Sequence, residues 1–331
     1  MGKRLKLLVV SDIHYAGPEE QKRRGYEERT TSSLIQRQLL RAYRDTIWLS
    51  DPLGHNHFLD WFFERSGDPD IVVANGDYSC DSAFIGLEDH ASFQSAEICL
   101  KKLHERFGSR LHEVYGDHEL GKKSLVGGVG GLRFKALERC RDELGLKPFW
   151  QFQKGNYVFM GVTSSLLSLE LILPEGLAED RDAWLKSREQ HIAEIDSAFR
   201  KLKRGQRVIL FCHDPTALPY LAQIPSVRSQ YGRIEQTIIG HLHSEYTFRM
   251  AKFLSGMPEI GFCGATVKRM SSAVKRAQKW EPFNVILCPS PTGIQAAKDG
   301  GFLTVELDPD DPQPLDWKYH HLPWDLPRMS R

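Results

Sequence analysis

The sequence predicts an α/β layered fold, because short apolar runs alternate along the chain with stretches of helical spacing. The apolar runs are rich in Val, Ile and Leu, as buried strands are, and cover residues 5–10, 71–74, 158–162, 208–212, 236–239, 284–288 and 302–307, with 111–115 as a weaker candidate. Apolar residues recur at helical spacing in residues 33–49, 93–107, 134–144 and 183–202. A chain of 331 residues can bury a sizeable core without disulfides.

The elements follow one another in an order that supports this reading. The first strand, 5–10, is an apolar run that stops before Asp12, and the first helix, 33–49, has Leu39, Leu40 and Ile47 on one face. The second strand, 71–74, is short and wholly apolar. Amphipathic helices then separate most of the later runs, which is the pattern of strands joined by crossover helices.

The composition excludes several classes of protein. Lys and Arg number 44 and Asp and Glu number 43, so the net charge of +1 offers no general attraction for nucleic acid, and no nucleic-acid partner is expected. No apolar run approaches the roughly 20 residues that span a bilayer, and the apolar N-terminal run is too short for a signal peptide. The scattered cysteines form no C-x-x-C pair, which favours reduced thiols in a cytoplasmic protein: Cys80, Cys99, Cys140, Cys212, Cys263 and Cys288.

Five short segments place metal-binding side chains directly after predicted strands. They are Asp12-Ile13-His14, Asn75-Gly76-Asp77, Gly116-Asp117-His118-Glu119, Cys212-His213-Asp214 and Gly240-His241-Leu242-His243. The carboxyl ends of strands border the functional crevice of open α/β sheets. We therefore expect these five segments to share one site.

The spacing within the segments suits metal binding. In an extended chain, Asp12 and His14 would point the same way, as would His241 and His243. The glycines before Asp77, Asp117 and His241 allow close turns. Mixed imidazole and carboxylate donors favour Mn, Fe, Zn, Ni or Co over Ca or Mg.

The ordered set of motifs resembles the calcineurin-like metallophosphoesterases, which carry D-x-H, G-D, G-N-H, H and G-H-x-H. The resemblance covers roughly residues 5 to 245 and implies a four-layered α/β/β/α sandwich. It implies one metal held by Asp12, His14, Asp77 and His243, and a second held by the bridging Asp77 with Asp117, His213 and His241. Manganese is the expected metal, with iron or zinc as alternatives.

The family mechanism is that of a two-metal hydrolase, in which a metal-bridging hydroxide attacks the phosphorus. His118 would then act as a general acid or charge stabiliser. Two positions depart from the family. Asp117 stands where Asn is usual, and its charge should tighten metal binding yet repel phosphate. Cys80 stands where an aspartate usually orients the histidine, which leaves Asp81 and Glu119 as candidate partners of His118.

We expect a single domain over 1–331, with a helical insert at about 18–68 and a C-terminal extension. The extension includes a basic amphipathic segment, 267–280, which suggests an anionic ligand or a membrane surface, or else a solvated helix. The apolar segment 166–174 could line an acyl-chain cleft or form a buried helix. The insert also holds many aromatic residues, most of which we expect to pack its helices.

These features favour a lipid-linked phosphorylated substrate. With them, the chain resembles the UDP-2,3-diacylglucosamine pyrophosphatases, which release UMP and a lipid monophosphate. The expected location is then cytoplasmic, with peripheral contact at the inner membrane. The alternatives are a cyclic-nucleotide or other phosphodiesterase or phosphatase, and a metal-binding scaffold without catalysis. The sequence predicts no oligomeric state.

Overall fold

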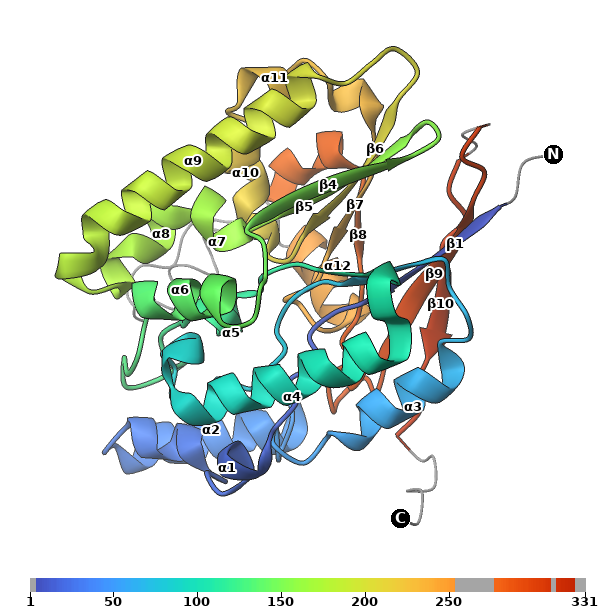
Figure 1. Cartoon of the computed structure of the whole chain (residues 1–331). Coiled ribbons are helices and arrows are strands. Elements are labelled where there is room, and N and C mark those ends of the chain that lie inside the picture. Colours follow the sequence, from blue (N-terminus) through green and yellow to red (C-terminus); the bar gives the residue numbers. More distant parts are fainter. Residues whose placement is uncertain (1–3, 254–276, 311–313, 325–331) are drawn as a thin grey trace.

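Two five-stranded mixed sheets form the centre of the molecule (Figure 1). The computed structural model describes residues 4–253, 277–310 and 314–324. The first sheet has the order β10-β9-β1-β2-β3, with parallel pairing among β1, β2 and β3 and antiparallel pairing of β9 with β1 and β10. Its strands are β1 (Leu5–Val10), β2 (Ile71–Ala74), β3 (Leu111–Glu113), β9 (Gly301–Leu307) and β10 (Lys318–His321).

The second sheet has the order β4-β5-β6-β7-β8, and all of its pairs are parallel except β4 with β5. Its strands are β4 (Phe149–Lys154), β5 (Tyr157–Val162), β6 (Arg207–Cys212), β7 (Ile234–Ile239) and β8 (Val285–Leu287). Parallel pairing sends the carboxyl ends of β1, β2 and β3 to one edge of their sheet, and those of β5 to β8 to one edge of theirs. These edges carry the segments that the sequence singled out.

Helices cover the outer faces of both sheets (Figure 1). The longer ones are α2 (Leu34–Thr46), α3 (His57–Arg65), α4 (His90–Phe107), α6 (Phe134–Asp142), α9 (Arg181–Arg200) and α12 (Glu245–Phe253). Single turns of helix connect them: α1 (Pro18–Gln21), α5 (Asp117–Leu120), α7 (Ser164–Leu167), α8 (Leu169–Ile172), α10 (Leu218–Leu221) and α11 (Pro225–Arg228). The 3₁₀ segments η1 (Tyr26–Thr30) and η8 (Ala277–Phe283) lie in the loops.

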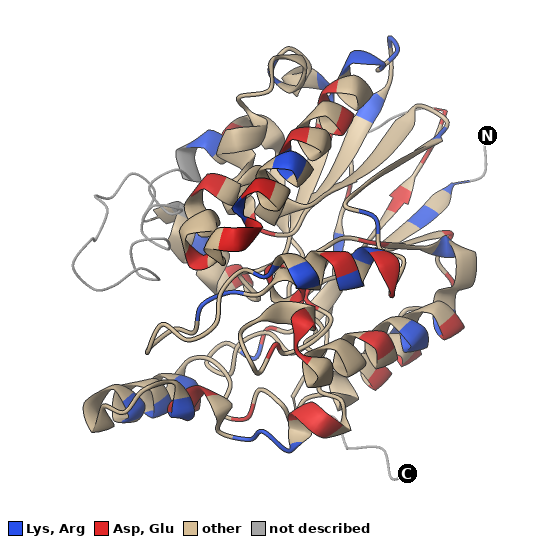
Figure 2. Ribbon diagram, turned by 60° about the vertical axis from the view of Figure 1, so that its left-hand side comes forward, with Lys and Arg blue, Asp and Glu red and all other residues tan. Residues whose placement is uncertain are grey.

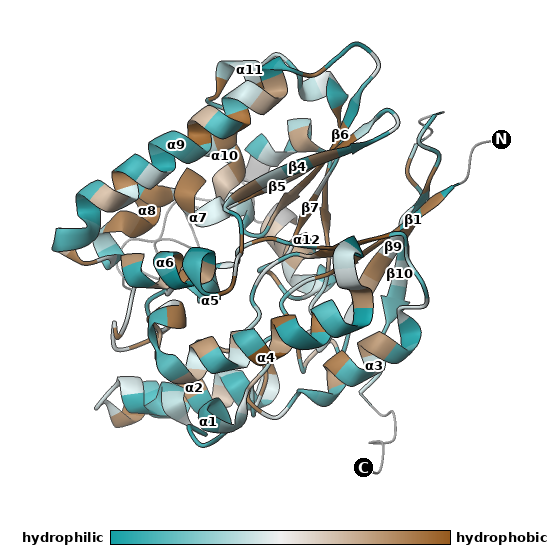
Figure 3. Ribbon diagram, viewed as in Figure 1, coloured by the Kyte–Doolittle hydropathy of each residue, from teal (hydrophilic) through white to brown (hydrophobic). Residues whose placement is uncertain are grey.

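The strand side chains build three apolar layers. Because side chains alternate along a strand, Leu7 and Val9 of β1 face the second sheet, where Phe159 and Phe211 pack in the same cluster. Leu8 and Val10 face the opposite way. The hydropathy colouring shows the two sheets as the brown interior of the molecule and the solvent faces of the helices as teal (Figure 3). The predicted α/β/β/α layering is confirmed.

Helix ends follow local sequence signals. Asp89 caps α4 by accepting a hydrogen bond from the backbone N–H of Ser92 at 2.9 Å, and Gly108 ends the helix with a positive φ of 57°. Ser33 caps α2 in the same manner. Positive and negative side chains mix along the helices, in keeping with the balanced net charge (Figure 2).

Several elements were not predicted from the sequence, among them two edge strands. The strand β4 is an edge strand whose side chains are at most half-buried, and β10 is an edge strand of sequence Lys-Tyr-His-His. Neither carries the apolar run that marks a buried strand. The helix α3, which begins at His57, lies within the insert that we expected to be helical. It is helical because Phe58, Trp61 and Phe62 bury one face of it.

The segments linked to a lipid substrate have different outcomes. Residues 166–174 form α7, α8 and a 3₁₀ turn, and Leu166, Leu167 and Leu169 are fully buried, as expected of a buried helix. Of the basic segment 267–280, residues 267–276 lie outside the described residues. Within residues 4–253, 277–310 and 314–324, every helix is too short or too polar to cross a membrane.

Candidate metal centre

Seven Asp and His side chains from five loops converge where the carboxyl ends of the two sheets meet. Each loop directly follows a strand of the parallel part of its sheet. Strands β1, β2 and β3 of the first sheet, and β6 and β7 of the second, supply Asp12, His14, Asp77, Asp117, His213, His241 and His243. The structure thus brings together every residue that the sequence analysis placed in the metal site.

The first group consists of Asp12, His14, Asp77 and His243. The Nε2 atoms of His14 and His243 lie 3.1 Å apart. Asp12 Oδ1 lies 3.3 Å from His243 Nε2, and Asp77 Oδ2 lies 3.6 Å from His14 Nε2. One donor atom from each residue lies within 4.8 Å of the others, so the four atoms surround a space that a metal ion could fill.

The second group consists of Asp77, Asp117, His213 and His241. His213 Nε2 lies 3.3 Å from both Asp77 Oδ2 and Asp117 Oδ1, and His241 Nδ1 lies 3.0 Å from Asp117 Oδ1. Asp77 belongs to both groups, which places the two candidate metal positions side by side. His213 Nδ1 lies 2.6 Å from the backbone oxygen of Asn75, so its proton sits on Nδ1 and Nε2 is left to bind an ion.

Buried polar atoms at the centre fit divalent metal. Asp12, Asp77 and His213 are fully buried. Asp77 Oδ2 and His213 Nε2 make no hydrogen bond within the described part of the chain. Buried carboxylates are normally paired or coordinate a metal, because an uncompensated charge in a dry interior is costly. Oxygen and imidazole donors together suit a transition metal such as Mn, Fe or Zn.

The backbone at these loops is left-handed and not extended. Five of the seven residues have positive φ values between 48° and 62°: Asp12, His14, Asp77, His241 and His243. The expectation that Asp12-x-His14 and His241-x-His243 converge through extended alternation is therefore wrong. They converge because the chain turns sharply after each strand. Non-glycine residues in this region cost about 1 kcal/mol or more each, and such strain is concentrated at functional sites.

Two glycines permit the close approach of the loops, as expected. A Cβ on Gly116 would lie 2.0 Å from Asp77 Oδ1, and a Cβ on Gly76 would lie 2.6 Å from the backbone nitrogen of Gly116. A side chain at either position would force the β2 and β3 loops apart. Asp77 could then no longer serve both groups.

The charges of the centre depend on one another. Burial alone would raise the pKa of Asp77, but His213 and His118 beside it lower that pKa well below its usual range. Burial likewise acts against ionisation of Asp117, but Lys122 and His241 lower its pKa well below normal. Burial lowers the pKa of His243. Asp77 and Asp117 are therefore ionised and His243 is neutral, the forms that bind metal, whereas the neighbouring carboxylates outweigh burial and raise the pKa of His213 and His241.

His118 lies beside the two groups and is held by the backbone. Its Nδ1 is 2.9 Å from the backbone oxygen of Cys80, and its Nε2 is 3.8 Å from Asp77 Oδ2. The partner is thus neither Asp81 nor Glu119. Asp81 accepts hydrogen bonds from the backbone of Ile85 and Gly86. Burial and the nearby Lys122 lower the pKa of His118 to about 3.

Glu119 organises the loops without entering the centre. Its buried carboxylate accepts hydrogen bonds from the backbone N–H groups of Asp77, Tyr78 and Gly116 at 2.7–2.9 Å. It therefore ties the β2 loop to the β3 loop. Glu119 was expected as a partner of His118, and its actual role differs because a residue type does not reveal which donors it will meet.

Two further side chains at the centre were missed. Lys122 Nζ lies 2.8 Å from Asp117 Oδ2. An acid in place of the usual Asn is a signal that could have prompted a search for a nearby cation. The Trp48 ring lies 4.7 Å from the His243 ring. Trp48 belongs to the aromatic set of the insert, and no sequence signal separates it from the packing aromatics.

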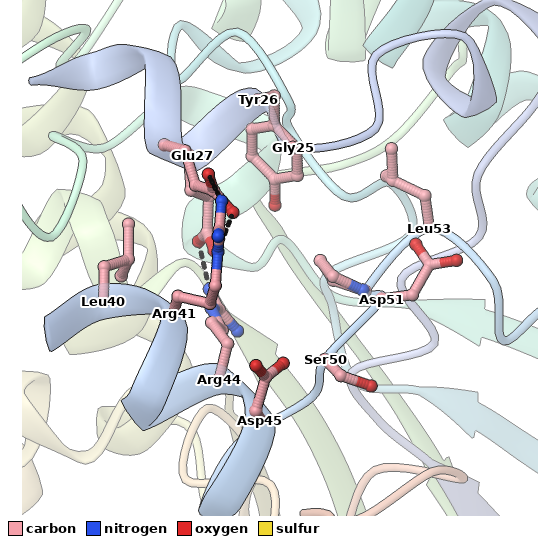
Figure 4. Close-up of a pocket in the computed structure, with 12 residues that line it drawn as sticks. Gly25, Tyr26, Glu27, Leu40, Arg41, Arg44, Asp45, Ser50, Asp51 and Leu53 are labelled. Carbon is pink, nitrogen blue, oxygen red and sulfur yellow. Dashed lines mark hydrogen bonds and ion pairs between the residues drawn. The ribbon is translucent and has the colours of Figure 1, made fainter. Parts of the chain in front are cut away.

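A small pocket lies apart from the centre, between η1, α2 and residues 50–53 (Figure 4). Its lining contains none of the seven converging residues. The ion pairs Arg44–Glu27 and Arg41–Glu28 cross it and fasten α2 to η1. These ion pairs therefore hold α2 in place. The candidate catalytic site is the cluster of Asp and His side chains.

Comparison with known proteins identifies the family. The chain matches the calcineurin-like phosphoesterase family over residues 5–245. A search of curated proteins finds no match.

Solved structures resemble the chain only distantly. A dimetal phosphatase from Danio rerio is 15% identical, with a TM-score of 0.45 over 91% of this chain and 92% of its own. A phosphopantetheinyl hydrolase from Mycobacterium tuberculosis is 17% identical, with a TM-score of 0.35 over 73% and 84%. A purple acid phosphatase from yellow lupin is 10% identical, with a TM-score of 0.40 over 96% and 53%.

Proposed function

The chain belongs to the calcineurin-like phosphoesterase family, and we propose that it hydrolyses a phosphoester or pyrophosphate bond at the two Asp and His groups. The observation that carries this proposal is the position of Asp77, whose carboxylate faces both groups. A shared carboxylate allows two ions to act on one phosphoryl group. Divalent ions bound there would supply positive charge to the phosphoryl oxygens and lower the pKa of the attacking water.

The proposed ligands divide between two ion positions, following the two groups of donor atoms. Asp12, His14 and His243 would hold one ion, Asp117, His213 and His241 the other, and Asp77 would bridge them. Supporting contacts fix these side chains. The carboxylate of Asp12 accepts from the backbone N–H of His241 at 2.9 and 3.0 Å, and Asn75 holds His213. Such contacts orient ligands before the metal arrives.

His118 is the proposed catalytic residue. Its Nδ1–H is tied to a carbonyl, so Nε2 is the nitrogen that faces the cluster. Once protonated at Nε2, it can donate a hydrogen bond to a phosphoryl oxygen or transfer the proton to the leaving oxygen, but its low pKa makes the protonated form scarce at neutral pH. A carbonyl supports a positive imidazolium less well than a carboxylate does. His118 should therefore work best on bonds whose leaving group needs little protonation.

This preference supports a pyrophosphate or another acidic leaving group. A nucleoside-diphosphate lipid such as UDP-2,3-diacylglucosamine, cleaved to UMP and a lipid monophosphate, is the specific substrate that we propose. One argument for the lipid has weakened, because Leu166, Leu167 and Leu169 are buried in the core. The leaving-group argument is independent of the acyl chains and also suits small nucleotide pyrophosphates.

The test is a substrate panel with the manganese-loaded protein, run in ¹⁸O-labelled water. The panel contains a nucleoside-diphosphate lipid, a nucleotide pyrophosphate, a cyclic nucleotide, an aryl phosphodiester and a phosphomonoester. We expect hydrolysis with one solvent oxygen in the product and the highest kcat/KM for a pyrophosphate. Turnover of the cyclic nucleotide alone would favour the phosphodiesterase alternative. Metal binding with no turnover of any compound would favour a scaffold.

A further inference from the structure

The two carboxylate oxygens of Asp117 face different partners. Oδ1 faces the second group, 3.0 Å from His241 Nδ1 and 3.3 Å from His213 Nε2. Oδ2 faces away from these rings and lies 2.8 Å from Lys122 Nζ. An asparagine at this position could supply only one oxygen, and its amide nitrogen could not accept a hydrogen bond from an ammonium group.

Lys122 is placed by the same loop that carries Asp117. The backbone N–H of Gly121 donates to the Asp117 carbonyl oxygen at 3.0 Å and ends the single turn of α5, so that Lys122 follows directly. The Lys122 side chain is 24% exposed, and that of Asp117 is 13% exposed. The pair is therefore shielded from water, where a charge pair interacts more strongly than on the surface.

The negative charge of the cluster explains why a cation beside Asp117 matters. Asp12, Asp77 and Asp117 bring three carboxylates to one small volume. With two divalent ions bound, each additional carboxylate reduces the positive charge that attracts a phosphate anion. A cation beside the third carboxylate restores that charge without occupying a metal position.

We propose that Asp117 and Lys122 act as a unit, in which Lys122 offsets the negative charge that Asp117 adds to the metal centre and so restores the attraction for a phosphoryl anion. This inference rests on the proposed function. It assigns Lys122 as a residue that determines the affinity of the centre for the anion. The ligand class that it favours is a phosphoryl anion such as a pyrophosphate, whose negative charges are attracted by one more nearby cation.

The test is a double-mutant cycle of Lys122→Met, Asp117→Asn and the double variant, with Lys122→Arg as the matched control that keeps the charge. Two quantities are measured for each protein. They are the affinity and stoichiometry of Mn²⁺ for the apoprotein, and the dissociation constant of inorganic phosphate for the Mn²⁺-saturated protein, both by calorimetry. Circular dichroism confirms that each variant is folded.

We expect Lys122→Met to weaken phosphate binding about tenfold while leaving Mn²⁺ binding equal or tighter. Asp117→Asn should weaken Mn²⁺ binding and leave phosphate binding equal or tighter. The double variant should bind phosphate within about threefold of the original protein, because both charges are removed together. Lys122→Arg should retain phosphate affinity.

Unchanged phosphate affinity in Lys122→Met would overturn the proposal. So would a double variant that binds phosphate as weakly as Lys122→Met alone, because Lys122 would then act independently of Asp117. If Asp117→Asn loses the second ion, the comparison of Lys122→Met with Lys122→Arg still decides whether charge matters. Neither measurement needs turnover, so a protein that binds phosphate in this pattern but hydrolyses nothing would refute the proposed function alone.

Discussion

His118 Nδ1 lies 2.9 Å from the backbone oxygen of Cys80, so the main chain orients this ring where a carboxylate side chain was expected. The Cys80 side chain points elsewhere, with its sulfur 3.0 Å from the carbonyl oxygen of His14, and it is buried beside Ala16 and Leu53. The orientation of His118 therefore depends on the path of the chain and not on the identity of residue 80.

Replacing Cys80 by Ala should leave the catalytic contact intact. The carbonyl oxygen remains, so kcat should stay within about twofold, while the small cavity lowers the free energy of unfolding by about 1 kcal/mol. Steady-state kinetics and urea denaturation measure the two effects. A loss of kcat above tenfold in a folded, metal-loaded variant would show that the thiol itself takes part.

Asp77→Asn should remove metal, because Asp77 is the only residue shared by the two groups. An amide is a poor bridging ligand, so the metal content should fall from about two ions per chain to fewer than one. Metal analysis after gel filtration measures this. The matched control is His118→Asn, which should keep both ions and lose about 100-fold or more in kcat. Equal metal content in the two variants would contradict the bridging role.

Glu119→Ala should destabilise the protein far more than a typical substitution. It leaves the backbone N–H groups of Asp77, Tyr78 and Gly116 buried without their acceptor, which should cost about 3–5 kcal/mol in the free energy of unfolding. Glu119→Gln retains one acceptor oxygen, so its free energy of unfolding should lie between those of the original protein and of Glu119→Ala. Urea denaturation of the three proteins, with metal removed by a chelator, measures the order of their stabilities. A Gln variant as unstable as the Ala variant would refute this explanation.

Trp48→Ala should raise KM for substrates with a large organic group. The Trp48 ring packs beside the His243 ring. The backbone N–H of Trp48 donates to the Tyr43 carbonyl oxygen, and the Trp48 carbonyl oxygen accepts from the Gln295 N–H. Removing the ring should raise KM about tenfold with little change in kcat, whereas Trp48→Phe should keep most of the contact. For a small phosphoester that cannot reach the ring, KM should not change in either variant.

His191 should contribute to the loss of stability in acid. It is buried in α9, accepts a hydrogen bond from the Thr163 N–H at 3.1 Å, and has a pKa lowered by burial from 6.5 to about 3. The unfolded chain binds the proton first, so the stabilising contribution is complete above pH 6.5 and declines as the pH falls toward 3.

Between pH 7 and pH 5 this residue alone should lower the free energy of unfolding by about 2 kcal/mol. The variant His191→Gln keeps an acceptor and does not titrate. Its stability should therefore fall less over the same range, which urea denaturation at each pH can measure. Parallel pH profiles for the two proteins would assign the acid sensitivity to other groups.

The sequence was informative where both faces of a strand are buried. Leu5–Val10 and Tyr157–Val162 are apolar because helices cover one face and the other sheet covers the opposite face, so they were found from composition alone. Phe149–Lys154 and Lys318–His321 are edge strands, and only their pairing partners define them. No local pattern carries that information.

The candidate site shows the same division. Asp12, Asp77 and His213 were named correctly as converging residues because metal donors after strand ends are a conspicuous pattern. The partner of His118 is a carbonyl oxygen, which every residue possesses, so sequence could not single it out. The left-handed turns at the ligand loops were also missed, since non-glycine residues rarely adopt them.

The division of the metal ligands between the sheets also determines when the centre can form during folding. Asp12 follows β1 near the start of the chain and His243 follows β7, and both ion positions combine ligands from loops of the two sheets. Contacts between residues this distant in sequence form late and slow folding. Capture of metal during refolding should therefore coincide with the last kinetic phase, and a metal-sensitive probe would report completion of the native state.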